Sequence, residues 1–81
     1  MLWNHKPPPP AKRKPGELLF EFVGKSGSPM ACELHFRGES YGFEAQFHRR
    51  GKLLFSQGAF VTRASAVQWA EWQRDAIVGS V

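Results

Sequence analysis

Three segments of the chain alternate between apolar and polar residues, as strands do when only one of their faces is buried. The first is ELLFEFV at residues 17–23, whose two sides hold Leu18, Phe20 and Phe22 against Leu19, Glu21 and Val23. The second and third are residues 30–38 and 41–48, which alternate in the same way. The loop GKSGSP at residues 24–29 separates the first strand from the second.

The second and third strands are predicted to form a hairpin with a tight turn at Glu39 and Ser40. Its register sets apolar residues opposite each other, pairing Phe36 with Phe43, Leu34 with Ala45 and Cys32 with Phe47. The same register places His35 opposite Glu44, which we interpret as a cross-strand polar pair.

The register of a fourth strand, within residues 52–62, stays open. A two-residue turn at Arg50 and Gly51 puts Leu54 inside, whereas a three-residue turn with Gly51 in the left-handed conformation reverses the two faces. A bulge at Gly58 would let both Phe55 and Phe60 reach the core.

A helix is predicted after Thr62, whose hydroxyl is a suitable N-cap, and Gly79 supplies its end. At about 100° per residue, one face of this helix collects Ala66, Trp69, Ala70, Gln73, Ala76 and Ile77. Trp69 is therefore expected to pack in the core. Trp72 falls outside this stripe, among or beside the polar residues.

These elements predict an α+β domain at residues 17–81: a three- to four-stranded antiparallel meander sheet, packed on one face by a single C-terminal helix. Residues 1–16 are predicted to be a flexible, basic, proline-rich tail, because Pro7 to Pro10 favour an extended rod. One helix covers one face of a sheet, so the other face is exposed unless a partner covers it.

Composition supports one small domain, since 81 residues with 42% apolar content can bury a single core. The net charge of +4 comes entirely from Lys6, Lys12, Arg13 and Lys14 in the tail, because seven basic and seven acidic residues follow. The folded surface therefore lacks the basic excess typical of proteins that bind nucleic acid by that surface alone.

The single cysteine, Cys32, excludes an intramolecular disulfide and is expected to be a small buried hydrophobe. The N-terminus has no apolar core of a signal peptide, and no apolar run approaches the length of a membrane span. A soluble, cytoplasmic protein without membrane contact is the expectation.

Catalytic signatures are missing from the sequence, and we predict a protein that is not an enzyme and has no cofactor. GKSGSP lacks the spacing of a phosphate-binding loop. His35 and His48 share a face, but their predicted separation is on the order of 13 Å along the strands, too far to bind one metal ion.

Residues 31–78 resemble a group of short, uncharacterised proteins from rhizobial and related alphaproteobacteria. The residues that carry the resemblance are CEL followed by a turn, then YGFEAQF, then F-x-TRA-x-AVQWAE-x-x-R. Membership of this group implies a fold and a source, and no known activity.

A weaker similarity links GKLLFSQGAFVTRASAVQWA to the last strand and helix entry of the arm-type DNA-binding domain of tyrosine recombinases. Those domains, like the ethylene-response-factor domain of plants, lay the exposed face of a three-stranded sheet in the major groove. This chain departs from that use, because the corresponding face carries Glu33 and Glu44, which repel phosphate.

Two binding functions follow as hypotheses. The first is a non-enzymatic module that binds an unknown protein partner, or a second copy of itself, through Trp72, His35, Arg37, Gln46 and His48; the tail folding back onto Trp72 is a further possibility within one chain. The second is an accessory protein that contacts nucleic acid through the exposed sheet face and through Lys12, Arg13, Lys14, Arg49, Arg50 and Lys52.

Overall fold

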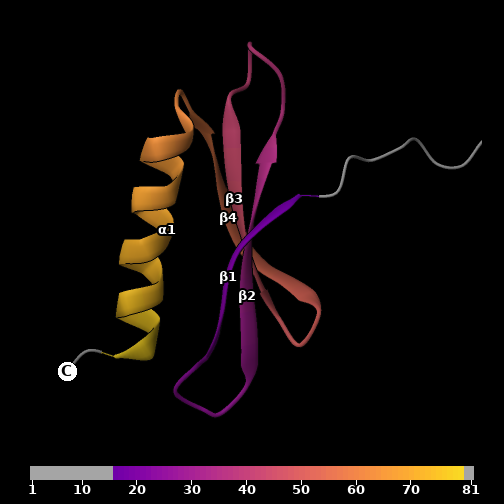
Figure 1. Cartoon of the computed structure of the whole chain (residues 1–81). Coiled ribbons are helices and arrows are strands. Elements are labelled where there is room, and N and C mark those ends of the chain that lie inside the picture. The colour runs from indigo at the N-terminus through magenta and orange to yellow at the C-terminus, as the bar shows by residue number, and fades with distance from the viewer. Residues whose placement is uncertain (1–15, 80–81) are drawn as a thin grey trace, which may run out of the picture.

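In the computed structural model, which describes residues 16–79, four antiparallel strands form a meander with one helix on one face (Figure 1). The strands are β1 (Glu17–Val23), β2 (Pro29–Phe36), β3 (Phe43–Arg49) and β4 (Lys52–Phe60), and the helix is α1 (Arg63–Val78). The predicted fold class is confirmed, with four strands. The predicted tail lies outside the described residues, apart from Gly16.

The register of the β2–β3 hairpin is the predicted one. Phe36 lies opposite Phe43, Leu34 opposite Ala45 and Cys32 opposite Phe47. The predicted tight turn at Glu39 and Ser40 is present, because the Tyr41 amide donates to the Gly38 carbonyl at 3.1 Å across these two residues. Gly38 and Gly42 flank the turn: the Gly42 amide also donates to the Gly38 carbonyl at 2.8 Å, and both glycines have positive φ.

Strand β1 contains an irregularity that changes its predicted sides. Leu18 lies opposite Glu33 and Phe20 opposite Cys32, so Leu19 is an extra residue between them. This bulge turns Leu18 toward solvent and lets Leu19 pack against the core with Phe20 and Phe22. The simple alternation predicted for this strand is therefore wrong at its first half.

Strand β4 begins with the two-residue turn, since Arg49 pairs with Lys52 and both Arg50 and Gly51 have positive φ. That turn alone would leave Phe55 on the polar side. A register shift next to it, with Leu54 as the extra residue, brings Phe55 onto Phe47, where the rings stack at 4.8 Å. The sequence gives no clear signal of this first shift.

A second register shift in β4 lies at Gly58 and Ala59, where the sequence predicts a bulge. Gln57 lies opposite Ala45 and Phe60 opposite Phe43, and Ala59 takes a positive φ of 66°. Phe60 consequently faces α1, with its ring centroid 5.7 Å from that of Trp69. Phe55 and Phe60 thus both lie on the side of the sheet that faces α1, as a bulge at Gly58 predicts.

Helix α1 begins and ends at the predicted residues. The Thr62 hydroxyl accepts a hydrogen bond from the Ser65 amide at 3.1 Å, and Gly79, in the left-handed conformation, donates to the Asp75 carbonyl at 3.0 Å. No helix within residues 16–79 is long and apolar enough to cross a membrane.

The core lies between the sheet and α1, as the apolar stripe predicts. Phe47, Cys32 and Ala45 of the sheet and Ala66 and Ala70 of the helix are fully buried. Around them pack Leu19, Phe20, Phe22, Phe55, Trp69 and Ile77. The stripe errs at Ala76, which is exposed.

Candidate functional site

The face of the sheet turned away from α1, here called the open face, has no layer of described residues over it (Figure 1). The strand registers place on it Leu18, Glu21, Val23, Ala31, Glu33, His35, Glu44, Gln46, His48, Leu53 and Ser56. Three of the predicted partner-binding residues, His35, Gln46 and His48, thus share this face. Arg37, just after β2, reaches it through its side chain.

Hydrogen bonds join the polar side chains of β3 along the strand. The Arg37 Nε donates to the Glu44 Oε1 at 2.8 Å, and the Gln46 Nε2 donates to the same oxygen at 3.3 Å. His48 continues the row, with its Nε2 3.2 Å from the Gln46 Oε1. Glu44, Gln46 and His48 are therefore each held by a neighbour two residues away on the same face, and Arg37 holds Glu44 at the end of the row.

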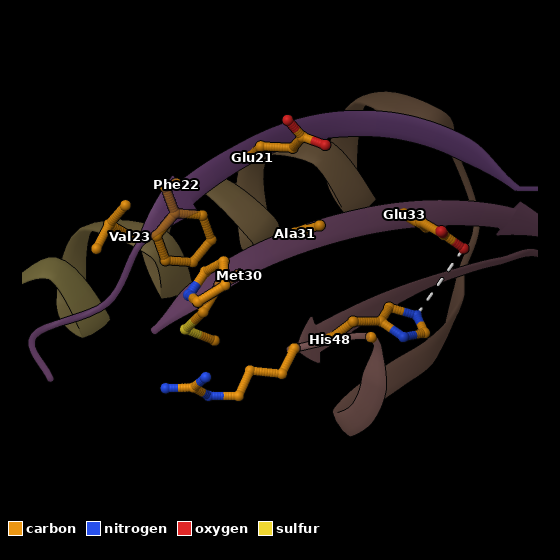
Figure 2. Close-up of a pocket in the computed structure, with 10 residues that line it drawn as sticks. Glu21, Phe22, Val23, Met30, Ala31, Glu33 and His48 are labelled. Carbon is orange, nitrogen blue, oxygen red and sulfur yellow. Dashed lines mark ion pairs between the residues drawn. The ribbon is translucent and has the colours of Figure 1, made fainter. Parts of the chain in front are cut away.

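Glu33 links this row to β2. Its Oε1 lies 3.1 Å from the Nε2 of His35 and 3.8 Å from the Nε2 of His48, an ion pair drawn in Figure 2. His35 does stand opposite Glu44 in the register, but its side chain contacts Glu33. The predicted His35–Glu44 pair is wrong because Glu44 is taken by Arg37, whose guanidinium forms a charged hydrogen bond.

The two histidines converge on Glu33 although their backbones are far apart. His48 stands opposite Ala31, four residues along β2 from His35. Both imidazoles lean along the strand direction toward the carboxylate between them, so backbone spacing overestimates the separation of the side chains. Among residues 16–79, no group of three or more His, Cys, Asp and Glu side chains is arranged to hold a metal ion.

The Glu44 carboxylate is held in its charged form. Partial burial raises its pKa, but hydrogen bonds from Arg37, Gln46 and Ser56 outweigh that effect and bring the pKa below its ordinary value of 4.5. Because the charges of Arg37 and Glu44 neutralise each other, this half of the open face presents little net charge.

A hollow of about 670 Å³ opens over Ala31 at the other half of the open face (Figure 2). Glu21 stands on one side of it and His48 on the other, since both lie opposite Ala31 on the flanking strands. Glu33 and Arg50 also line it. The hollow exists because alanine is the smallest side chain in this row and its neighbours are large.

Trp72 does not join the open face. It lies on α1, in the other layer, with 62% of its surface exposed, whereas Trp69 packs edge-on against Phe47 and Phe55. Trp72 thus lies outside the core stripe, as predicted. The predicted partner-binding residues therefore lie on two separate surfaces, the open face and the exposed side of α1.

Two aromatic side chains are exposed at the β2–β3 loop. The hairpin reaches past the first turn of α1 (Figure 1), so Phe36 and Tyr41 are 60% and 73% exposed. The helix does not cover Phe36, because α1 begins only at Arg63, after Phe60 has paired with Phe43.

The basic residues of the second hypothesis are divided by the structure. Arg49, Arg50 and Lys52 are exposed at the β3–β4 turn, where Arg50 also donates to the Ser28 hydroxyl at 3.4 Å. Lys12, Arg13 and Lys14 lie outside the described residues.

Cys32 is a buried hydrophobe, as predicted. It is 0% exposed between the sheet and α1, and its burial, with a smaller effect of the Glu33 charge, raises the pKa of its thiol to about 12. A thiol without thiolate character in a closed core is a poor nucleophile.

Sequence reasoning missed two features of the site. Glu33 was noted as a charge on the open face, but its position between two histidines depends on side-chain directions across two strands. The hollow over Ala31 was also missed. Its signal is one small residue at an outward position, which becomes meaningful only when β1 and β3 are placed beside β2.

Comparison with protein-family models, with curated proteins and with solved structures found no match for this chain. The resemblances to the rhizobial group and to the arm-type domain therefore stay predictions. The function has to be argued from the geometry of the site.

Proposed function

We propose that this protein is a non-enzymatic binding module that holds a protein partner against the open face of its sheet. The observation that carries the proposal is an array on a face that α1 leaves uncovered: hydrogen bonds join Arg37, Glu44, Gln46 and His48, and an ion pair joins His48 to Glu33. Side chains that hold one another in place lose less conformational entropy when a partner binds.

Apolar side chains on the same face favour a protein as the partner. Leu18, Val23 and Leu53 are each more than half exposed, around a polar centre. Burying such residues against another chain supplies the hydrophobic contribution that fixed polar groups do not.

Edge-to-edge pairing is the less favoured mode of self-association. Both edge strands, β1 and β4, contain register shifts, and bulges bend an edge away from the straight ladder that a second strand needs. A second copy would accordingly bind by the face of the sheet.

Site-specific photocrosslinking tests the proposal. A photoreactive phenylalanine analogue replaces Gln46, at the centre of the open face, and in a matched variant replaces Gln68, which is exposed on α1. In cells that make the protein, we expect a discrete protein adduct from position 46 and none from position 68. The mass of the adduct distinguishes a second copy from a different partner.

Nucleic acid is the alternative partner, supported by the exposed cations Arg49, Arg50 and Lys52 at one tip. Nuclease treatment of the crosslinked sample separates the two. An adduct at position 46 that nuclease destroys would establish the alternative, and equal adducts from both positions would refute a specific open face.

A further inference from the structure

The N-terminal segment joins the domain at the start of the edge strand β1, beside His35 of the open face. A methyl group placed on Gly16, the first described residue, would lie 2.5–2.9 Å from ring atoms of His35. The imidazole therefore lies where a side chain of residue 16 would stand, which glycine permits because it has none. The fifteen preceding residues are tethered to the domain at this point.

The part of the open face next to Gly16 carries acidic groups with spare capacity. Glu33 uses Oε1 for both histidine contacts, which leaves Oε2 without a contact among the described residues. Glu21, across the hollow, has no hydrogen bond or ion pair with residues 16–79. Arg37 is paired with Glu44, and Arg50, the one Lys or Arg residue that lines the hollow, donates to Ser28 and forms no ion pair with a carboxylate of residues 16–79.

The N-terminal segment has the complementary chemistry. Residues 1–16 contain four cations and no acid, and Lys12, Arg13 and Lys14 lie within four residues of Gly16. An extended chain advances about 3.4 Å per residue, so the four residues from Gly16 to Lys12 span roughly 13 Å, the distance along the face from Gly16 to the row of Glu21 and Ala31. Lys12 can therefore reach this row if the chain turns back at Gly16. A lysine or arginine stem suits the small apolar floor at Ala31, with its charged head among carboxylates.

We propose that the cluster Lys12–Lys14 docks in cis on the acidic half of the open face, with one cation over Ala31 between Glu21 and Glu33. An exposed ion pair is weak by itself, but a tethered segment acts at an effective concentration in the millimolar range, which makes weak contacts effective. The segment then competes with the partner for the same face, a consequence that rests on the proposed function.

Paramagnetic relaxation in the full-length chain tests the docking. A nitroxide is attached to A11C, while Cys32 stays unlabelled because it is fully buried with a raised thiol pKa. We expect the amide signals of Ala31 and Glu33 to be broadened several-fold more than that of Glu71, which is exposed on α1. High salt should abolish the difference.

Two sets of substitutions identify the contact. Neutralising the segment with K12S, R13S and K14S, or the face with E21Q and E33Q, should each remove the selective broadening. The matched control E71Q removes an acid from α1 and should leave it unchanged. Uniform broadening, broadening centred on Trp72, or persistence in either neutralised variant would overturn the proposal.

Mixing spin-labelled chains with isotope-labelled chains separates cis from trans. Selective broadening that is confined to chains carrying both labels supports docking in cis. Equal broadening in the mixture would show that the segment docks on a second copy, and would overturn the proposal.

The two proposals fail independently. A crosslink at position 46 together with uniform broadening supports the proposed binding face and refutes the docking of Lys12–Lys14. Selective broadening without a crosslink supports the docking and refutes the binding face. If both hold, neutralising Lys12–Lys14 should raise the yield of the crosslinked partner several-fold, and an unchanged yield would refute the competition.

Discussion

At position 42, a close backbone contact restricts the residue to glycine. It has a φ of 71°, in the left-handed region, and a β-carbon there would overlap the carbonyl oxygen of Phe60 on β4. Because the obstacle is backbone, neither partner can move away without disturbing the β3–β4 ladder. Gly42 thus allows the β2–β3 loop to close against the end of β4.

Replacing Gly42 with alanine should lower the free energy of unfolding by at least about 2 kcal/mol, from the strained φ together with the backbone overlap. The matched control is Gly51→Ala: its φ is 84° and its surroundings are open, so only the strain of about 1 kcal/mol remains. Urea denaturation measures both values. Equal losses would show that the contact with Phe60 is unimportant.

At the scale of elements, α1 separates two tryptophans three positions apart. Trp69 contacts Phe47, Phe55 and Phe60, which come from two strands, so it anchors the helix to the sheet. Trp72, three positions later, points about 60° away from Trp69 around the helix axis and is largely exposed. Similar residues in one helix therefore have different roles, decided by the 3.6-residue period.

Trp69→Ala should cost about 3 kcal/mol of stability, as expected when a large aromatic is removed from a packed layer. Trp72→Ala should change stability by no more than about 0.5 kcal/mol. Thermal or urea unfolding of the two variants, compared with the parent, measures the difference. A large loss from Trp72→Ala would mean that this side chain is part of the core.

At the scale of the whole molecule, two layers enclose one core on one side of the sheet. Cys32 lies between these layers, and its exposure requires that α1 separate from β2 and β3. The thiol therefore reports whether the layers are closed, independently of any function.

Ellman's reagent at pH 8 should react with Cys32 in the folded protein at least roughly 10³-fold more slowly than in the urea-unfolded chain, because a pKa of about 12 leaves almost no thiolate. The rate should rise with urea in parallel with global unfolding. Rapid reaction with intact circular dichroism would instead reveal local opening of the two layers.

Much of the fold followed from patterns that are local in sequence. The β2–β3 register, the Thr62 and Gly79 caps and the buried side of α1 each depend on residues close to one another along the chain. Alternation, helical period and capping chemistry determine such features, because the interacting groups are neighbours before the chain folds. The existence of an uncovered sheet face followed in the same way, from one helix and one sheet.

The tertiary structure alone decided the bulges at Leu19 and Leu54, the exposure of Phe36, and the partners on the open face. A bulge forms when burying Phe20 or Phe55 stabilises the fold more than the lost ladder hydrogen bonds destabilise it. That balance depends on strands that are distant in the sequence. Glu33 binds two histidines, and a hollow forms over Ala31, because strands far apart in sequence set their side chains side by side. The chain alone therefore indicated which face of the sheet is uncovered, and only packing decided which atoms that face presents.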